Sequence, residues 1–192
     1  MDVPTVASLA LSVLGLGGTA YYGHKSLKLE QRIRRYDWAD IAFGVRKIGR
    51  TAFRDFQPDL MLSLSGPGSI VSNLILIDTV RYMPLYVGIS ERNPPPAGGC
   101  RPNYQRTVAT SRWITYVPDD VFRFASQRIL ICDDCVITGD TLARLVALLV
   151  ENGFPRENIR TASLFVTELA LAAGLGPDVY WMKVQDSEFY LP

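Results

Sequence analysis

The sequence predicts an α/β domain built on a mostly parallel sheet, preceded by one membrane-spanning helix. Short apolar runs alternate with amphipathic helical patterns, Gly- and Pro-rich segments separate them, and an uncharged apolar run stands near the start of the chain. Strand–helix alternation gives parallel strands joined by right-handed crossovers, with helices flanking the sheet. A chain of 192 residues suits one such domain plus an appendage.

The first element is an uncharged segment at residues 3–23, "VPTVASLALSVLGLGGTAYYG". Its length is close to the roughly 20 residues that a helix needs to cross a bilayer. Residues 24–35, "HKSLKLEQRIRR", carry five basic side chains against Glu30. Positive charge directly after a span places the N-terminus outside and the rest of the chain in the cytoplasm. We therefore expect a single-pass protein of the inner or plasma membrane, with a basic juxtamembrane segment at 24–35.

Two other interpretations of residues 3–23 stay open. A cleaved signal peptide normally has a basic stretch before its apolar run, which "MDVPT" lacks. A buried helix of the folded domain is the other, although the uncharged run is long for one.

The remaining elements are predicted within a domain that covers residues 36–192. Apolar residues recur at helical spacing in 38–56 and 140–153, and a further helix is expected at 69–82 after a "GPG" turn. Strands are expected at 58–65, 84–90, 113–118, 128–134 and 159–167, followed by a β-rich tail at 177–192. Residues 91–112 contain three consecutive prolines and should form a long loop, which in a compact domain is commonly a functional lid.

The composition excludes several function classes. The formal net charge is only +1, so no excess of positive charge favours a nucleic-acid partner. Three cysteines do not make a disulfide framework. His24 is the only histidine, so neither a Ser-His-Asp triad nor a His-rich metal site can be assembled.

The segment "RILICDDCVITGDTLARL", residues 128–145, allows two chemistries. Cys132 and Cys135 have the spacing of a redox or metal pair, but such a pair usually opens a helix, and the helix here starts later. Alternatively, a buried strand delivers Asp133 and Asp134 to its carboxyl end, where adjacent carboxylates can hold vicinal hydroxyls and a divalent cation. The following turn can bind a phosphate at a helix N-terminus. An ordinary strand–helix turn with a capping Asp is the third alternative.

The pattern "ILICDDCVITGDTL" resembles the motif with which type I phosphoribosyltransferases bind 5-phosphoribosyl 1-diphosphate (PRPP). "FQPDLMLSLSGPGS" resembles their diphosphate loop, "MPLYVGISER" their second strand before a catalytic flap, and "PDVYWMKVQDSEFYLP" the hood that contacts the base in some members. The resemblance covers about residues 36–192 and implies a Rossmann-type, mostly parallel sheet flanked by helices. It also implies PRPP and Mg²⁺ as ligands and allows a homodimer.

The resemblance assigns a role to each matching position. Asp133 and Asp134 would bind the ribose hydroxyls directly or through Mg²⁺, and Arg101 or Arg106 of the flap would act with them in catalysis. The other positions would bind the 5-phosphate (Ile137, Thr138, Gly139, Asp140, Thr141), line the diphosphate (Ser65, Gly66, Pro67, Gly68, with Arg92 and Tyr104 covering it), and stack on a base (Tyr180, Trp181).

Three positions depart from the family pattern. No basic residue precedes Gly66, and Pro67 removes one backbone donor. Ile137 stands where members that act on 6-oxopurines carry an acid. Asp140 puts a carboxylate in the phosphate turn, where it would repel the ligand if it faced the site and would cap the following helix if it pointed outward.

The resemblance implies transfer of the phosphoribosyl group from PRPP to a nitrogenous base with release of diphosphate. Two competing hypotheses share the same residues. One is a nucleotide or PRPP sensor without catalysis, which the departures in the diphosphate loop favour. The other is a membrane effector, in which Gly15, Gly17 and Gly18 help spans to pack together.

Overall fold

The computed structural model describes residues 34–95, 106–185 and 189–190. It divides into two compact units, one formed by Met1–Asp37 with Glu188–Pro192 and the other by Trp38–Ser187. In the first unit, β1 (Arg34–Arg35) pairs in parallel with β10 (Phe189–Tyr190). All other described elements belong to the second unit.

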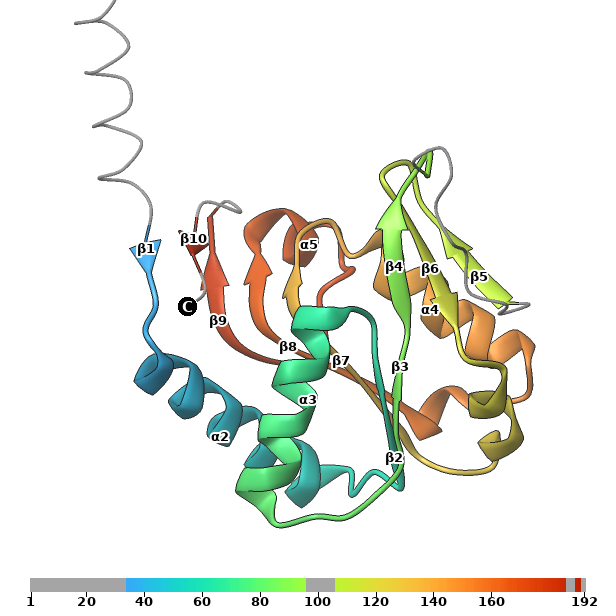
Figure 1. The fold of residues 1–192 in the computed structure, drawn as a ribbon, viewed down its shortest axis with the longest axis horizontal. Coiled ribbons are helices and arrows are strands. Elements are labelled where there is room, and N and C mark those ends of the chain that lie inside the picture. The colour runs from blue at the N-terminus through green and yellow to red at the C-terminus, as the bar shows by residue number, and fades with distance from the viewer. Residues whose placement is uncertain (1–33, 96–105, 186–188, 191–192) are drawn as a thin grey trace, which may run out of the picture. The chain divides into compact units, whose positions relative to one another are not determined.

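The second unit is built on a five-stranded sheet with the order β3-β2-β7-β8-β9 (Figure 1). Every neighbouring pair in this sheet is parallel, which confirms the predicted α/β architecture with a mostly parallel sheet. The strands are β2 (Leu60–Ser63), β3 (Leu85–Val87), β7 (Ile129–Val136), β8 (Ile159–Thr167) and β9 (Val179–Val184). Because β7 lies at the centre, both its faces are covered, and Ile129–Cys132 are fully buried.

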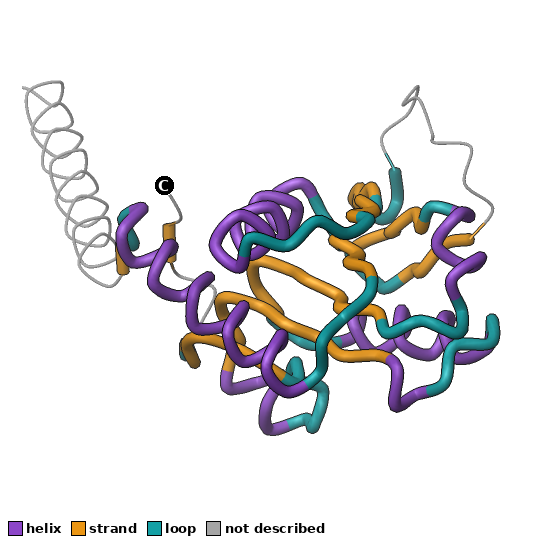
Figure 2. Tube along the Cα trace, turned by 90° about the horizontal axis from the view of Figure 1, so that it is seen from below, coloured by secondary structure: helices purple, strands orange, loops and turns teal. Residues whose placement is uncertain are grey.

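Helices cover both faces of the sheet, as Figures 1 and 2 show. On one face, α2 (Trp38–Asp55) packs on β8 and β9, and α3 (Gly66–Thr79) packs on β2 and β7. On the other face lies α4 (Asp140–Glu151). A short α5 (Glu168–Ala172) follows β8, and two 3₁₀ helices span Asp119–Phe124 and Arg156–Asn158.

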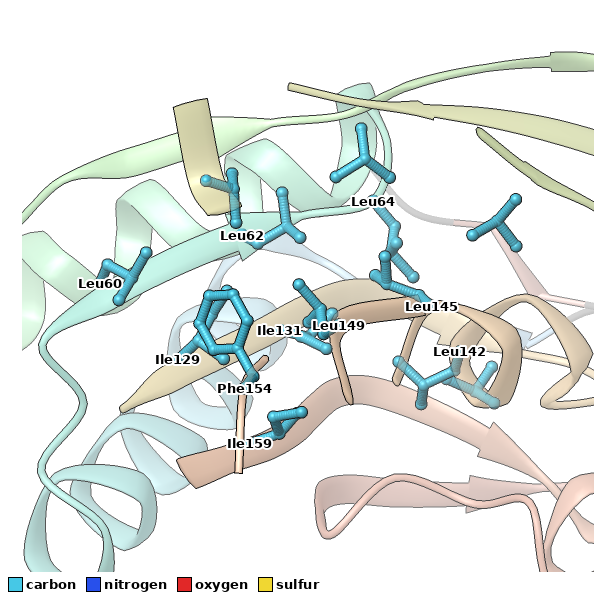
Figure 3. Close-up of a cluster of buried hydrophobic side chains, with 14 of the residues drawn as sticks. Leu60, Leu62, Leu64, Ile129, Ile131, Leu142, Leu145, Leu149, Phe154 and Ile159 are labelled. Atoms are coloured by element: carbon cyan, nitrogen blue, oxygen red, sulfur yellow. The ribbon is translucent and has the colours of Figure 1, made fainter. Parts of the chain in front are cut away.

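The core beneath α4 joins the helix to the central strands (Figure 3). Leu142, Leu145 and Leu149, at helical spacing, pack against Leu62 of β2 and Ile131 of β7. Burying side chains of this size stabilises the fold by roughly 1.5–3 kcal/mol each. This packing fixes where α4 begins, and therefore where the turn between β7 and α4 lies.

A second, antiparallel sheet was not expected from the sequence. Its order is β4-β6-β5, with β4 (Ile89–Arg92), β5 (Arg106–Ala109) and β6 (Trp113–Val117). The strand expected at 84–90 divides at Gly88, whose N–H bonds to Ser63 O at 2.7 Å, so that β3 and β4 enter different sheets. The loop expected at 91–112 accordingly contains the end of β4 and all of β5, while residues 96–105 lie outside the described part.

The predicted turn at "GPG" is wrong, because Gly66–Gly68 form the first turn of α3. Ser65 is the N-cap, and its hydroxyl accepts a hydrogen bond from the Gly68 N–H at 3.0 Å. A serine N-cap with proline at the start of a helix is a favourable combination, because proline lacks the N–H that would otherwise need a partner. The helix therefore starts three residues earlier than expected.

The predicted membrane span at residues 3–23 and most of the basic segment 24–35 lie outside the described residues. Within the described ranges, no helix combines the length and the apolar character needed to cross a membrane.

Candidate functional site

The candidate site lies at the carboxyl ends of β2 and β7. Ser63 of β2 is in register with Cys132, and the next residue of β7, Asp133, is in register with Ser163 of β8. Parallel register brings the loop after β2 and the acids of β7 to the same edge of the sheet. Ligands of open α/β sheets bind at this edge.

Asp133 is held between its own strand and the loop after β2. Its Oδ1 atom accepts a hydrogen bond from the Ser65 hydroxyl at 3.1 Å and another from the Asp134 N–H at 3.0 Å. Since Ser65 also caps α3, one hydroxyl connects the start of that helix to the carboxylate. The two segments that sequence reasoning assigned to ribose and to diphosphate are therefore in direct contact.

Burial and the neighbouring carboxylate of Asp134 raise the pKa of Asp133 well above its ordinary range. The hydrogen bond from Ser65 acts in the opposite direction but does not outweigh them. The negative charge of Asp133 is thus only partly compensated in the protein alone. A cation or hydroxyl donors from a ligand would stabilise the charged form.

The first turn of α3 packs closely against this acid. A Cβ atom added to Gly68 would lie 2.9 Å from Ser63 Oγ and 3.1 Å from Asp133 Oδ1, so a larger residue would require these side chains to shift. Pro67 has no N–H, and the Gly68 N–H is bound to Ser65, so of residues 65–68 only Ser65 and Gly66 could offer a backbone N–H to an anion. The predicted diphosphate loop therefore presents few backbone donors in this conformation.

The turn between β7 and α4 is held from two sides. The Thr167 hydroxyl, which caps α5, donates to the Ile137 carbonyl. Gly139 has a φ of 82°, and a Cβ atom there would lie 2.2 Å from the carbonyl oxygen of Leu175. Only glycine suits this conformation and this approach. Thr138, Gly139, Asp140 and Thr141 are thus brought together at the N-terminus of α4, as predicted for a phosphate turn.

Asp140 begins α4, and its carboxylate is turned toward Thr138. The Thr138 hydroxyl donates to Asp140 Oδ2 at 3.1 Å, and both residues are exposed.

Three supporting residues were missed by sequence reasoning. Thr167 and Leu175 fix the turn, and the Ser90 hydroxyl donates to the Leu64 carbonyl at 2.8 Å, which ties β4 to the loop after β2. A Thr followed by Glu168 at the end of an apolar run is a helix-start signal that could have identified Thr167. Leu175 carries no local signal, because its role depends on tertiary packing.

The cysteines do not form a reactive pair. Burial raises the pKa of Cys132 to about 12, and burial together with Asp134 and Asp133 raises the pKa of Cys135 to about 12 as well. Both are free thiols, and a protonated thiol is a poor nucleophile and metal ligand. Among the described residues, no three His, Cys, Asp or Glu side chains are arranged to hold a metal ion.

The structure describes two of the predicted flap residues, and it bonds Arg106 away from the site. Arg92 ends β4 and is exposed, while Arg101 and Tyr104 lie outside the described residues. The Arg106 guanidinium bonds to Asp119 at 2.9 Å and to Asn152 at 3.0 Å. Asn152 follows the last residue of α4, so Arg106 lies at the opposite end of that helix from Asp140, roughly 18 Å away at 1.5 Å per residue.

The two aromatic residues predicted to bind a base differ in their surroundings. The ring of Trp181 lies 5.4 Å from that of Phe165, and a Cβ atom on Gly44 of α2 would lie 2.5 Å from the indole. The structure therefore uses Trp181 for packing between β9 and α2. Tyr180 is 38% exposed and in register with Ser163, which is itself in register with Asp133. Tyr180 is the more exposed of the two, since Trp181 is partly buried.

Comparison with solved structures identifies the fold. A purine phosphoribosyltransferase from Pyrococcus horikoshii is similar with a TM-score of 0.62 at 17% identity, over 83% of this chain and 92% of that one. The chain has the phosphoribosyltransferase fold. The xanthine-guanine-hypoxanthine phosphoribosyltransferase of Helicobacter pylori is similar with a TM-score of 0.60 at 13% identity, over 83% of this chain and 92% of that one.

A third neighbour with this phosphoribosyltransferase fold is a hypothetical protein from Neisseria gonorrhoeae with bound ppGpp. Its TM-score is 0.60 at 15% identity, over 82% of this chain and 88% of that one. No family model matches the sequence, and no curated protein is similar to it at a significant level. At these low sequence identities, the structural similarity supports the fold alone.

Proposed function

We propose that the protein is a membrane-anchored phosphoribosyltransferase that binds PRPP with Mg²⁺ and transfers its phosphoribosyl group to a nitrogenous base. In this reaction a base nitrogen attacks the anomeric carbon, and the bond from that carbon to the diphosphate oxygen breaks. The electron pair leaves with diphosphate, and the attacking nitrogen loses its proton. The phosphoribosyltransferase fold supports this reaction class.

The observation that carries the proposal is the contact of Asp133 with the Ser65 loop and the continuation of the same strand into the turn at 137–141. Acceptors for two ribose hydroxyls, a loop for diphosphate and a turn for the 5-phosphate follow one another along one sheet edge. The turn adds the favourable end of the α4 dipole for an anion.

Asp133 and Asp134 fit Mg²⁺ as a partner that is shared with the substrate. Mg²⁺ is commonly held by one or two carboxylates together with substrate phosphates and water, and the raised pKa of Asp133 indicates a carboxylate whose charge the protein leaves partly uncompensated. When bound, the ion would neutralise charge that develops on the leaving diphosphate. Asp133 and Asp134 would hold it and orient the ribose.

Two residues narrow the range of bases that could accept the phosphoribosyl group. Ile137 is 44% exposed and has no group that could take a proton from a 6-oxopurine, which favours a base that needs no acid at this position. Tyr180 offers an exposed ring on the strand two places from β7, where a base could stack.

The proposal includes a membrane anchor at residues 3–23. The uncharged segment 3–23 and the basic residues that follow support a single-pass protein of the inner or plasma membrane, with the N-terminus outside and the phosphoribosyltransferase domain in the cytoplasm. Full-length protein that stays in the soluble fraction of a cell lysate prepared without detergent would contradict it.

A second candidate function is a nucleotide sensor without catalysis. The loop Ser65–Gly68 favours it, because its cap and its proline leave few donors for a leaving diphosphate. The neighbour with bound ppGpp shows that this fold also appears with a bound guanine nucleotide. Both candidates use the same acids and the same turn.

One experiment separates the two. Detergent-solubilised full-length protein is incubated with PRPP, Mg²⁺ and a panel of purine and pyrimidine bases, and diphosphate release is followed. We expect base-dependent release that the Asp133→Asn and Asp134→Asn double variant loses. PRPP binding without release with any base would refute the transferase and retain the sensor, whereas no binding of any ribose phosphate would refute both.

A further inference from the structure

The outer surfaces of α2 and α3 adjoin on one side of the domain. The two helices lie side by side on the same face of the sheet (Figure 1). Arg46 of α2 donates to Asp78 of α3 at 3.0 Å across this surface, and a Cβ atom on Gly49 would lie 3.1 Å from the Thr79 side chain. We name the exposed side chains of α2, α3 and residues 80–82 the α2–α3 face.

The α3 part of this face exposes large apolar side chains. Ile70 and Ile77 lie about two helical turns apart on the outer side of α3, and both are more than half exposed. After the helix, Val80 is 73% exposed and Tyr82 is 97% exposed. On α2, the Phe43 ring is also mostly exposed. Apolar side chains gathered on one exposed face indicate a surface that binds a partner or a membrane.

Val80 has a backbone conformation that its side chain disfavours. It is the C-cap of α3, with a φ of 51° and a ψ of 46° in the left-handed region. Glycine commonly takes this position, whereas a β-branched residue there is an outlier. Because the Val80 side chain is mostly exposed, its packing within the protein does not offset this strain. An apolar side chain at a strained, exposed position points to a role outside the fold.

The α2 part of the face is basic. Phe43, Lys47 and Arg50 recur at i, i+4 and i+7, so they lie along one exposed row of the helix. In the described ranges, neither Lys47 nor Arg50 forms an ion pair within 4.0 Å. Arg81 adds an exposed guanidinium, 5.6 Å from the ring centroid of Phe53.

The acids on this face do not cancel its positive charge. Asp78 is bound to Arg46, and Asp55 is bound to Arg54. Asp40 lies in the first turn of α2, where a negative charge complements the helix dipole. The cations of the preceding paragraph therefore stay available to an anionic partner.

The place of this face in the chain favours a membrane as that partner. Only residues 24–37 separate the uncharged segment 3–23 from Trp38, the first residue of α2. Even fully extended, this link keeps the start of α2 within roughly 50 Å of the end of that segment. A second copy of the chain fits less well, because a two-fold interface would set the same basic surface against itself.

We propose that the α2–α3 face docks on an anionic lipid bilayer, with Ile77, Val80 and Tyr82 inserted among the headgroups and Lys47 and Arg50 beside lipid phosphates. Surfaces of this kind combine apolar insertion with attraction to anionic lipids. The inference rests on the proposed function only through its membrane anchor. Docking leaves α4 turned away from the bilayer, because α4 packs on the opposite face of the sheet (Figure 2).

The test follows a fluorophore on the full-length protein reconstituted in vesicles. Asn73 is exposed between Ile70 and Ile77, so Asn73→Cys in a Cys100→Ser background carries the label and keeps every apolar side chain of the face. The vesicles contain phosphatidylcholine with or without phosphatidylglycerol, and a lipid with a nitroxide quencher near the headgroup. We expect strong quenching at position 73 in vesicles with phosphatidylglycerol. Ala147→Cys, exposed on α4, is the matched control and should be quenched little.

Two sets of variants separate charge from apolar insertion. Lys47→Gln with Arg50→Gln should lower the ratio of docked to undocked protein about thirtyfold, and high salt should reproduce this loss. Val80→Gly should lower the ratio about fourfold, the contribution of one buried methylene group, yet leave the unfolding midpoint unchanged or raised. Gln57→Gly is its matched control, because Gln57 is the other described non-glycine residue with a left-handed φ and has no apolar side chain.

Each outcome decides the inference. Equal quenching at positions 73 and 147, or none at either in anionic vesicles, would overturn docking and leave the anchor and the transferase standing. Copies that cross-link through position 73 in detergent, without quenching by lipid, would assign the face to an interface between two copies. If the full-length chain stays soluble without detergent, the anchor is refuted. The same vesicles added to the soluble protein then test docking, which absence of quenching would overturn as well.

Discussion

The carboxylate at the amino ends of β2 and β7 has a lowered pKa, whereas the carboxylate at their carboxyl ends has a raised pKa. At the amino ends, Asp59 meets Arg128, whose Nε and Nη2 donate to it at 3.1 Å, and whose backbone N–H adds a bond at 2.9 Å. These bonds lower the pKa of Asp59. At the carboxyl ends, Asp133 meets Asp134 and the hydroxyl of Ser65, and its pKa is raised.

This difference distinguishes a structural end of the sheet from a functional one. At the amino end the Arg128 guanidinium also donates to the Phe56 carbonyl at 3.1 Å, so that charge and hydrogen bonds are supplied within the chain. At the carboxyl end two acids adjoin each other with no arginine or lysine among the bonds that Asp133 makes. Strong perturbation of a carboxylate at the ligand-binding edge is typical of functional sites.

The largest effect is expected from neutralising the functional end with Asp133→Asn. Loss of a charged acceptor for ribose hydroxyls should weaken ribose 5-phosphate binding about a thousandfold, or ~4 kcal/mol, as two hydrogen bonds to a charged group contribute. Isothermal titration in Mg²⁺ measures this. Glu157→Gln, an exposed acid outside the site, is the control.

The same variant should be more stable than the native protein when no ligand is present. A carboxyl whose folded pKa is raised stabilises the fold below its unfolded pKa and loses that contribution as the pH rises through the folded value. The stability gain from Asp133→Asn should therefore be absent at low pH and present at pH 8 in urea unfolding curves. A loss of stability at pH 8 would contradict the pKa direction given above.

The next largest effect is expected on β9, where one aromatic residue should contribute to packing and the other to base binding. Trp181→Ala should lower the free energy of unfolding by about 3 kcal/mol, because the indole fills the space between Phe165 and Gly44. Tyr180→Ala should change stability by less than about 0.5 kcal/mol and raise KM for the base. A raised KM with unchanged stability for Trp181→Ala would restore this residue as the base platform.

Much of the fold could be predicted from local patterns. The apolar spacing in α2 and α4, and the continuous apolar runs of β7 and β8, depend on burial that recurs along the chain, so the elements were predicted almost to their ends. Residues 133, 134 and 138–141 followed from the same reasoning, because a strand that ends in polar residues before a helix must place them at one edge of the sheet.

The rest depended on contacts between distant segments. The start of α3 at Gly66 reflects Ser65, whose hydroxyl bonds both to Gly68 and to Asp133 on another strand. The division of residues 84–90 at Gly88 depends on Ser63 of a neighbouring strand. Alternation along β9 shows that residues 180 and 181 face opposite sides, but only the position of α2 decides which of them is packed.

A smaller effect tests how tightly the loop is built against the functional end. Gly68→Ala should destabilise the protein by about 1.5 kcal/mol, since the new methyl group would press on Ser63 and Asp133. Gly66→Ala is the matched control, because nothing lies within 4 Å of its Cβ position and its stability should be unchanged or slightly raised. Equal thermal unfolding midpoints for the two variants would refute the close contact of this loop with Asp133.

The smallest effect is expected at the structural end, from Arg128→Ala. The pair is about 40% exposed, so solvent screens its attraction, and the loss of stability should be smaller than for Gly68→Ala.

Since the pKa of Asp59 is lowered in the folded protein, the contribution of the pair is present above the unfolded value near 4 and is lost as the pH falls through the folded value. Urea unfolding from pH 7 down to pH 3 should therefore show native and variant curves converging. The difference for Asp133→Asn also shrinks as the pH falls, but with the opposite sign, because that variant is the more stable protein at high pH and Arg128→Ala the less stable one. Arg54→Ala, which removes a pair between exposed neighbours, should leave the curve unchanged at every pH. Parallel curves for Arg128→Ala across this range would show that the arginine acts through its bond to the Phe56 carbonyl and not through the charge of Asp59.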